Sequence, residues 1–184
     1  MSKKIEFEKL AANIELTLNS NSCKTISIFN TNYKNNKLGI ISNITKELKN
    51  MGQKVLLINT IYNKDSVKGD TLFINSIEEV PQVFKKIVST ENSTELKIID
   101  LQIKRESLDA VLNVLLPALK LDYDRIIISV DTPLESAESR IICSLTDATL
   151  MLIDQSTTLR SEIRKTISLL KLANANFIGY VICK

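Results

Sequence analysis

Lys37 is the residue best placed to do chemistry, because it lies in a polar loop between an apolar run and a segment with helical spacing. A lysine just before a helix can bind the outer phosphates of a nucleotide. Loops of this kind normally read GxxxxGK followed by Ser or Thr, so that backbone N–H groups surround the phosphates and a hydroxyl binds Mg²⁺. In NTNYKNNKLG, Asn36 and Leu38 take the places of the last glycine and the hydroxyl. Lys37 is therefore either a phosphate-binding lysine or a solvated lysine near a helix start.

Two asparagines, Asn35 and Asn36, bear on the shape of this loop. Asparagine adopts left-handed backbone conformations more readily than most residues, which favours a loop that keeps its turn. The side chains would nevertheless occupy the space that glycines leave for phosphate oxygens. We therefore expect a loop of the right outline with a poorer fit to phosphate.

Six short apolar runs rich in β-branched residues predict the strands that hold this loop. They are apolar nearly throughout rather than alternating, which is typical of strands buried on both faces of a sheet. The runs cover residues 25–29, 55–58, 96–101, 125–130, 149–153 and 176–183. Between them, apolar residues recur at helical spacing in the segments 40–48, 108–115 and 163–170. This alternation predicts an α/β fold with three layers, α/β/α, around a mostly parallel sheet.

Residues 1–20 are predicted to form a leading helix with one apolar face, which must pack on the sheet or on another subunit. That face consists of Phe7, Leu10, Ala11, Ile14 and Leu18. Residues 60–73 are the most polar and least patterned part of the chain and are predicted to form a long loop. In open parallel sheets, ligands bind beyond the carboxyl ends of the strands. The loops to consider are therefore 30–39, 59–64 and 129–136.

Composition limits the classes of protein to which this chain can belong. Its 184 residues suit one domain, long enough to bury a sheet covered on both faces. The 44% of hydrophobic residues is typical of a globular protein, and a net charge of +3 is too small to indicate nucleic-acid binding. The sequence has no histidine, which excludes Ser-His-Asp and Cys-His nucleophile systems. Any catalysis would use carboxylates, lysine or a bound metal.

Cys23, Cys143 and Cys183 are predicted to be free thiols, buried or half-buried, since they are odd in number, far apart and without the spacing of a zinc site. The first ten residues, MSKKIEFEKL, lack the apolar core of a signal peptide. No apolar run approaches the roughly 20 residues that cross a bilayer. We therefore expect a cytoplasmic protein, which a partner could hold at the inner face of the membrane.

Four segments, taken in order, carry a resemblance to a known family. They are FEKLAANIEL from Phe7, KTISIFNTNYKNNKLGIISNITKELKNMGQKVLLINT from Lys24, YDRIIISVDTPLESAES from Tyr123, and LTDATLMLIDQSTTLRSEIRKTISLLKLANANFIGYVICK from Leu145. They resemble the leading helix, the Walker A loop with the A′ strand, the Walker B segment and the last strands of the bacterial tyrosine kinases (BY-kinases) of capsule and exopolysaccharide synthesis. These kinases are deviant-Walker P-loop proteins, as are chromosome-partition and cell-division-site ATPases. The resemblance covers nearly the whole chain and implies one P-loop NTPase-like domain over residues 1–184.

The resemblance assigns a role to each polar position of the site. It implies a vestigial nucleotide-binding loop with Lys37 at the Walker lysine, made of Lys34, Asn35, Asn36, Lys37, Leu38 and Gly39. Asn59 stands at the Walker A′ aspartate. Ser129 stands at the Walker B aspartate, unless Asp131 serves there after a two-residue slip; otherwise Asp131 is a turn residue before Thr-Pro. A hydroxyl and two carboxylates that would bind Mg²⁺ are thus replaced by leucine, asparagine and serine.

We therefore expect a degenerate BY-kinase-like protein. It would be a pseudokinase that acts as a regulatory binding partner in capsule or exopolysaccharide biosynthesis, without catalytic residues, a metal site or a cofactor. One alternative is a residual ATP-binding tyrosine kinase or ATPase of the same family, which would use ATP and magnesium through Lys37 and Asp131. The other is a partition-type deviant-Walker ATPase.

The resemblance also implies protein partners rather than nucleic acid. They would be a membrane polysaccharide-assembly adaptor, a kinase paralogue, or further copies of the chain in a homo-oligomer. The family's leading helix joins subunits through an ExxRxxR pattern, where this chain has Ile5, Glu8 and Ala11. The four tyrosines are scattered and form no cluster of the kind that these kinases phosphorylate. The family's mode of self-assembly therefore lacks its usual residues here.

Overall fold

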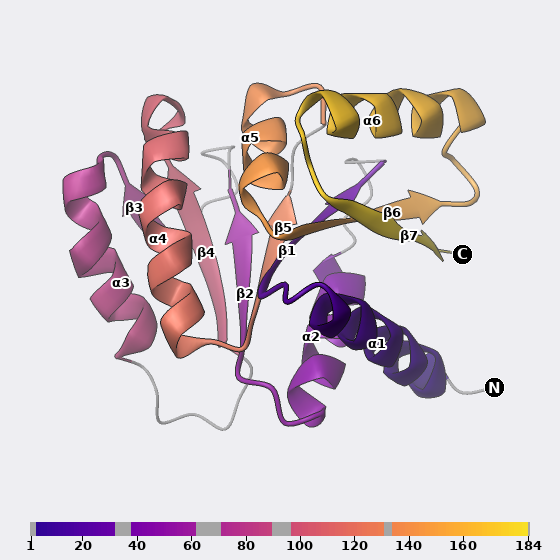
Figure 1. Ribbon diagram of the computed structural model, residues 1–184, viewed down its shortest axis with the longest axis horizontal. Coiled ribbons are helices and arrows are strands. Elements are labelled where there is room, and N and C mark those ends of the chain that lie inside the picture. Colours follow the sequence, from indigo (N-terminus) through magenta and orange to yellow (C-terminus); the bar gives the residue numbers. More distant parts are fainter. Residues whose placement is uncertain (1–2, 32–37, 62–70, 90–96, 131–133, 184) are drawn as a thin grey trace.

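The computed structural model describes residues 3–31, 38–61, 71–89, 97–130 and 134–183, in which helices and strands alternate along most of the chain (Figure 1). The strands are β1 Thr25–Asn30, β2 Val55–Thr60, β3 Leu72–Ile74, β4 Lys97–Ile103, β5 Arg125–Val130, β6 Ala148–Asp154 and β7 Phe177–Cys183. The helices are α1 Lys3–Ser20, α2 Leu38–Asn50, α3 Val80–Val88, α4 Leu108–Asp122, α5 Ala137–Leu145 and α6 Arg160–Leu172. Two short 3₁₀ helices, Ile77–Glu79 and Arg105–Ser107, lead into α3 and α4.

The strands form one sheet in the order β3-β4-β2-β5-β1-β6-β7, and each neighbouring pair runs parallel. All six predicted strands are present, with bounds that shift by at most two residues. Nearly every residue of β1, β5 and β6 is buried, which is why these strands are apolar almost throughout. The prediction of a mostly parallel sheet is confirmed.

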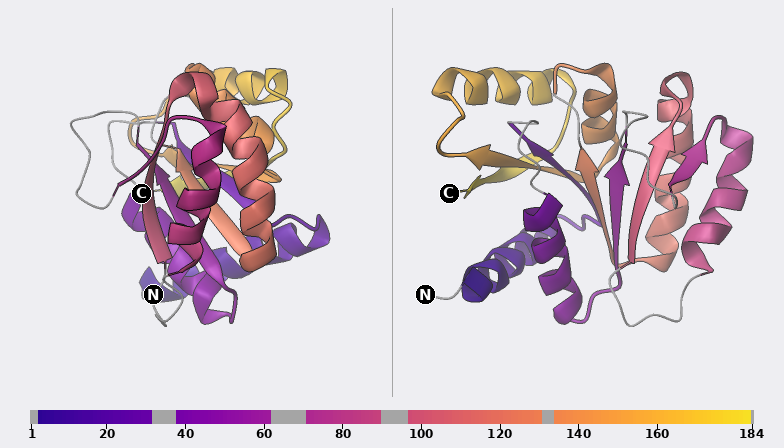
Figure 2. Two further views of the ribbon diagram at one scale, coloured as in Figure 1. Left: turned by 90° about the vertical axis from the view of Figure 1, so that its left-hand side faces the viewer. Right: turned by 180° about the vertical axis from the view of Figure 1, so that it is seen from behind.

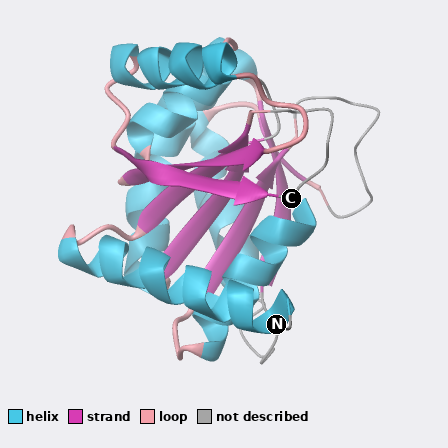
Figure 3. Cartoon of the chain, turned by 90° about the vertical axis from the view of Figure 1, so that its right-hand side faces the viewer, coloured by secondary structure: helices cyan, strands magenta, loops and turns pink. Residues whose placement is uncertain are grey.

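Helices cover both faces of the sheet, which confirms the three-layer α/β/α architecture (Figures 2 and 3). One core lies beneath α3, α4 and α5 and includes Leu56 and Ile128. The other lies beneath α1 and α2 and includes Leu57 and Ile127. Because successive side chains of a strand point to opposite faces, one apolar run supplies both cores. Within the described ranges, no helix has the length and apolar character needed to cross a membrane.

The leading helix α1 packs beside α2 and on the sheet, so its apolar face needs no second subunit (Figure 1). Ala11, Ile14 and Leu18 are buried in the core that these helices cover. On a neighbouring face of α1, the Arg125 guanidinium donates to both carboxylate oxygens of Glu15, at 2.6 and 2.9 Å. These two side chains are only 8% and 12% exposed. A buried ion pair therefore ties α1 to the start of β5.

Sequence patterns miss three short elements, β3, α3 and α5. The predicted loop over residues 60–73 is wrong at its two ends, because Thr60 completes β2 and Leu72–Ile74 forms β3. A three-residue strand at the edge of a sheet is too short to show a period, and it is fixed here by pairing with β4. Residues 62–70 of that segment lie outside the described residues.

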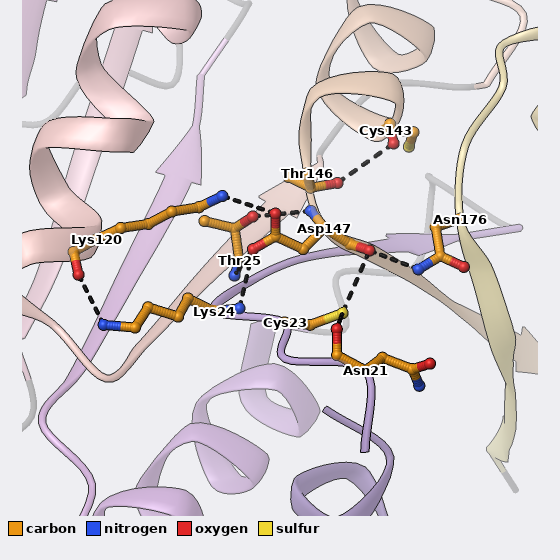
Figure 4. Close-up of polar contacts among 9 residues, drawn as sticks. All are labelled: Asn21, Cys23, Lys24, Thr25, Lys120, Cys143, Thr146, Asp147 and Asn176. Atoms are coloured by element: carbon orange, nitrogen blue, oxygen red, sulfur yellow. Dashed lines mark hydrogen bonds and ion pairs between the residues drawn. The ribbon is translucent and has the colours of Figure 1, made fainter. Parts of the chain in front are cut away.

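Asp147 anchors the amino edge of the sheet, at the end opposite to the predicted ligand loops (Figure 4). Its carboxylate accepts N–H bonds from Lys24 and Thr25 at 2.9 and 2.8 Å, and one from the Lys120 ammonium at 2.6 Å. Its carbonyl accepts a bond from the Asn176 amide. Burial raises the pKa of this carboxyl, but the bonds from Lys120, Thr25 and Lys24 outweigh burial and leave the pKa below its ordinary value. One residue thus links the starts of β1, β6 and β7 to α4.

The three cysteines are free and buried, as predicted. Burial raises the pKa of Cys143 to about 11, although hydrogen bonds with Ser27 and Thr149 partly oppose this effect. Burial also raises the pKa of Cys23. The thiols are therefore packing residues rather than nucleophiles in the native state.

Candidate functional site at the carboxyl edge

The predicted ligand loops leave from three neighbouring strands at one edge of the sheet. β2, β5 and β1 are adjacent and end at Thr60, Val130 and Asn30. This is the edge at which parallel α/β sheets bind ligands. Of the predicted site residues, Lys34, Asn35, Asn36, Lys37 and Asp131 lie outside the described residues. The structure places the other four.

Leu38 and Gly39, predicted to be the last two residues of the vestigial nucleotide-binding loop, form the first turn of α2. Ile41, Ile44 and Leu48 are buried and hold this helix on the sheet. A helix N-terminus presents unpaired N–H groups that favour anions. A Cβ on Gly39 would meet no heavy atom within 4 Å, so no close contact requires glycine at this position. The helix that would carry the loop is intact, whereas neither residue offers a hydroxyl.

Asn59 and Ser129 stand side by side, because β2 and β5 pair in parallel with these two residues in register. On the other side of Asn59, Asp100 of β4 is in register with it. Residues in register on parallel strands project to the same face, here the face of Leu57 and Ile127 that α1 and α2 cover. A row of three polar residues therefore crosses β4, β2 and β5 close to their carboxyl ends. The residues predicted for the A′ and B positions are therefore neighbours on the sheet.

The side chain of Asn59 is hydrogen-bonded to Asp100. Its Nδ2 donates to Asp100 Oδ1 at 2.9 Å. Its Oδ1 is buried and has no hydrogen-bond partner among the described residues. The amide orientation is fixed by this contact, because the reverse assignment would place one oxygen against another. Asn59 therefore offers a neutral oxygen at the position for which the sequence resemblance implies an aspartate.

Ser129 is nearly inaccessible, with 4% of its surface exposed. Its carbonyl accepts a bond from the Thr60 hydroxyl at 2.9 Å, which links the ends of β5 and β2. A serine hydroxyl carries no charge at neutral pH and is a weak base. Ser129 thus helps to hold the two strands together without supplying a negative ligand.

Mg²⁺ would not fit the positions that the sequence resemblance assigns to it. Asn59 and Ser129 supply no carboxylate, and hard cations favour charged oxygen ligands. Asp100 has a carboxylate, but it lies on β4, three strand positions from β1. At about 4.8 Å per strand, this places it on the order of 14 Å to the side of the strand that leads into the loop. The displaced carboxylate does not replace the missing ones.

On the other side of β1, the segment after β6 is fastened to the edge. The Thr31 and Thr158 hydroxyls are 2.8 Å apart, and the Thr31 N–H donates to Leu152 O at 3.0 Å. Beside this contact lies a cleft of about 190 Å³. Its lining residues are Phe29, Asn30, Thr31, Leu134, Glu135, Glu162, Lys165 and Thr166.

A surface ion pair spans this cleft, with Lys165 Nζ 3.0 Å from Glu135 Oε1. The hydrogen bond from Lys165 keeps the pKa of Glu135 below its ordinary value. Both side chains are more than half exposed, so the pair contributes little to stability. The cleft is thus a polar feature of the same edge, beside the predicted nucleotide site.

Sequence reasoning missed Asp100. The signal that could have found it is a charged residue inside the apolar run LKIIDL, since a carboxylate is seldom placed in a buried strand without a partner. The partner could not be named, because the adjacency of β2 and β4 follows from the strand order and not from the sequence.

Together, the parallel sheet, the two helical layers and the loop positions at the carboxyl edge define a P-loop NTPase-like fold. No protein-family model matches the sequence, and no curated protein matches it. Solved structures do match. Among the comparisons with known proteins, the likeness is therefore one of structure and not of sequence.

The particular likeness is to bacterial tyrosine kinase domains. The kinase domain of the Escherichia coli tyrosine kinase ETK superposes with a TM-score of 0.80 at 15% identity, over 98% of this chain and 75% of that one. The VpsO kinase domain superposes with a TM-score of 0.73 at 16% identity, over 99% of this chain and 96% of that one. The cell division protein MinD of Aquifex aeolicus superposes with a TM-score of 0.60 at 21% identity, over 86% of this chain and 68% of that one. The chain thus has the fold of BY-kinase domains and of their deviant-Walker relative MinD.

Proposed function

We propose that this chain is a degenerate BY-kinase-like protein, a pseudokinase that works through binding and not through Mg-ATP-dependent phosphoryl transfer. The observation that carries the proposal is the row of residues at the carboxyl edge. Asn59 and Ser129 occupy adjacent positions in register, with no carboxylate at either, and the Asn59 amide donates to Asp100.

Phosphoryl transfer depends on metal ions and on positioned positive charge, because the transferred group carries negative charge on its oxygens. A neutral amide oxygen and a buried serine would hold Mg²⁺ far less tightly than two carboxylates. Neither side chain can accept a proton from a tyrosine hydroxyl at neutral pH. The strands and helices of the fold require buried apolar residues and not the residues of the site. The fold can therefore be retained when the chemistry is lost.

The partner that we propose is a protein of the polysaccharide-assembly machinery, either a membrane adaptor or a true kinase subunit, in capsule or exopolysaccharide synthesis. Support comes from the likeness to BY-kinase domains, and MinD was solved in complex with MinC, as an example of this fold that binds a protein. Such a partner would bring the chain to the cytoplasmic face of the membrane. A homo-oligomer is the simplest alternative assembly.

The test for loss of chemistry is titration with ATP, with and without MgCl₂, followed by calorimetry and thermal unfolding. We expect no stabilisation by ATP that depends on magnesium. The matched variants are Lys37→Ala and Lys46→Ala, since Lys46 is an exposed lysine of α2 that the site does not use. Stabilisation that requires magnesium, disappears in Lys37→Ala and survives in Lys46→Ala would instead establish the residual ATP-binding kinase or ATPase.

The test for regulation is the autophosphorylation rate of a kinase paralogue from the same genome, measured with and without this protein. A regulatory partner should change that rate and should co-elute with the kinase or its adaptor in size-exclusion chromatography. An unchanged rate together with separate elution would refute this part of the proposal.

A further inference from the structure

The last strand, β7, forms an open edge of the sheet. It pairs with β6 on one side, and no strand of the described residues pairs with its other side. Figure 3 shows β7 in front, with α6 on one face of the sheet and α1 on the other. Its sequence, FIGYVIC, contains no charged residue and no proline. Native proteins commonly protect an edge strand with such residues, because an open edge can pair with another chain.

Tyr180 and Ile182 direct their backbone groups to the open side. The Gln155 N–H donates to Cys183 O at 3.0 Å, so the backbone of Cys183 faces the side of β6. Along a strand in a parallel sheet, the N–H and C=O groups of successive residues point alternately to its two neighbours. Val181 therefore faces β6, and Tyr180 and Ile182 face outward. The N–H and C=O groups of both residues can pair with an added strand.

The side chains of Tyr180 and Ile182 form an apolar strip on the α6 face of this edge. They are in register with Met151 and Ile153 of β6, which are buried in the core beneath α5. Residues in register on parallel strands project to the same face. Tyr180 and Ile182 are nevertheless 56% and 55% exposed, because no further strand lies beside them in the described part of the sheet.

The side of α6 that faces this edge is basic. Arg160, Arg164 and Lys171 share one side of the helix, because their spacings are close to whole numbers of turns. All three are exposed, and none forms an ion pair with a described residue. Leu169 and Ala173, which line a cleft between α5 and α6, lie on the opposite side of the helix. The basic side therefore faces away from α5 and toward β7, the outermost strand (Figure 1).

The acidic residue of α6 does not neutralise this basic side. Glu162 lines the cleft at the carboxyl edge, on the α5 side of the helix, and its carboxylate accepts the Leu159 N–H at 2.8 Å. Lys165, which lines the same cleft, is paired with Glu135. The open edge thus combines unpaired backbone groups, an apolar strip and a flanking row of cations.

We propose that the β7 edge binds an extended acidic segment of a partner protein, which adds a strand to the sheet. In strand addition, main-chain hydrogen bonds give affinity and alternate side chains give specificity. The outward groups of Tyr180 and Ile182 would supply the hydrogen bonds. Acidic side chains at every second position of the added strand would lie on the α6 face, where Arg160 and Arg164 attract them.

A second copy of this chain fits the edge less well. Two β7 strands that pair antiparallel in one continuous sheet are related by a two-fold axis normal to the sheet, so both α6 helices lie on the same face. Their basic sides would face each other across the junction, where like charges repel. β7 has no acidic residue to offset that repulsion. The charge of the edge therefore favours an acidic partner.

The β7 surface deepens the proposed binding function and rests on it, since the ligand is again a protein segment. It uses neither the lysine loop nor the row at Asn59 and Ser129. A peptide-binding experiment contains no nucleotide and no kinase. Its failure would therefore leave the ATP titration and the autophosphorylation assay to be decided on their own results.

The test is fluorescence anisotropy with a labelled synthetic peptide that alternates Glu with Val, compared with a peptide that has Lys in place of Glu. We expect saturable binding of the Glu peptide that weakens as salt is added. Arg160→Glu combined with Arg164→Glu should weaken this binding by about tenfold or more, because the charge beside the edge is reversed. Lys46→Glu combined with Lys85→Glu, at exposed lysines of α2 and α3, is the matched control and should bind as the parent does.

Ile182→Pro tests the strand pairing itself. Proline removes the outward N–H and leaves the bonds to β6, so the variant should unfold at a temperature close to that of the parent and lose the peptide. If Ile182→Pro does not fold, the charge-reversed variant decides the outcome. Equal binding of the two peptides, no saturable binding of the Glu peptide, or equal binding by the parent and the charge-reversed variant would overturn the proposal. So would a dimer in sedimentation velocity that Ile182→Pro converts to monomers, since the occupant would then be a second copy.

Discussion

At the scale of single residues, two aspartates show how one side chain acquires different tasks. Asp147 accepts three bonds from an ammonium and two backbone N–H groups, whereas Asp100 has one amide as its partner. Asp147 is a structural residue whose carboxylate accepts several hydrogen bonds, whereas the Asp100 carboxylate accepts a single one among the described residues. The sequence contains both as isolated aspartates in apolar surroundings, and their contacts depend on which strands are neighbours.

Asp147→Asn should lower the free energy of unfolding by about 2 kcal/mol, because it weakens bonds to a charged acceptor and removes the ion pair with Lys120. The pKa of this carboxyl is depressed in the folded state, so its contribution is present above the ordinary pKa of 3.8 and is lost as pH falls below that value. Urea unfolding at several pH values measures both effects.

The difference between the parent protein and Asp147→Asn should therefore be largest near neutral pH and shrink in acid. Asp109→Asn, at an exposed position, should differ from the parent by little at any pH. A difference that grows as the solution becomes more acidic would contradict the assignment of Asp147 as a stabilising carboxylate.

At the scale of elements, predictability followed length and burial. The long apolar runs of β5 and β6 could be located to within one residue, because burial on both faces leaves a plain pattern. The stripe over residues 108–115 locates the start of α4 but not its end at Asp122. β3 could not, because its three residues become a strand only by pairing with β4. The placement of α1 also required the structure, since its apolar face fitted a sheet or a second subunit equally well.

The ion pair between Arg125 and Glu15 should be important for holding α1. Arg125→Met leaves the Glu15 carboxylate buried without its partner and should cost about 3 kcal/mol of unfolding free energy, measured by urea denaturation. The double variant Arg125→Met with Glu15→Leu should recover most of that loss, because apolar residues of similar volume replace both charges.

The matched control is Lys165→Met, which breaks the exposed pair with Glu135 on the other side of the molecule. It should change stability by less than about 1 kcal/mol. Equal losses in Arg125→Met and Lys165→Met would show that burial of the first pair does not matter.

At the scale of the whole molecule, the fold was predictable and the site only partly so. Alternating strand and helix patterns specify a parallel three-layer architecture, and the order of the loops places Asn59 and Ser129 at one edge. The contacts of those residues follow from the register of three strands that are far apart in the sequence. A single sequence carries no direct signal of that register.

The buried thiols report on the whole fold. Because Cys23, Cys143 and Cys183 are all buried, a thiol reagent such as DTNB at pH 8 should label the native protein slowly and the protein in urea at all three positions. The pKa of Cys143, about 11, leaves little thiolate at that pH. Rapid labelling of native protein at Cys143 would show that the core beneath α5 opens more readily than its packing implies.

The Asp147 anchor and the polar row at Asn59 lie toward opposite edges of one sheet, three residues or about 10 Å apart along the strands. Asp147 and its partners fix the strand ends at the amino edge. None of these residues belongs to the predicted site at the carboxyl edge. Evolution could exchange residues at one end of such a molecule while selection for foldability acted on the other. A molecule built this way can change the residues of its carboxyl edge and still fold, because the anchor at its amino edge is untouched.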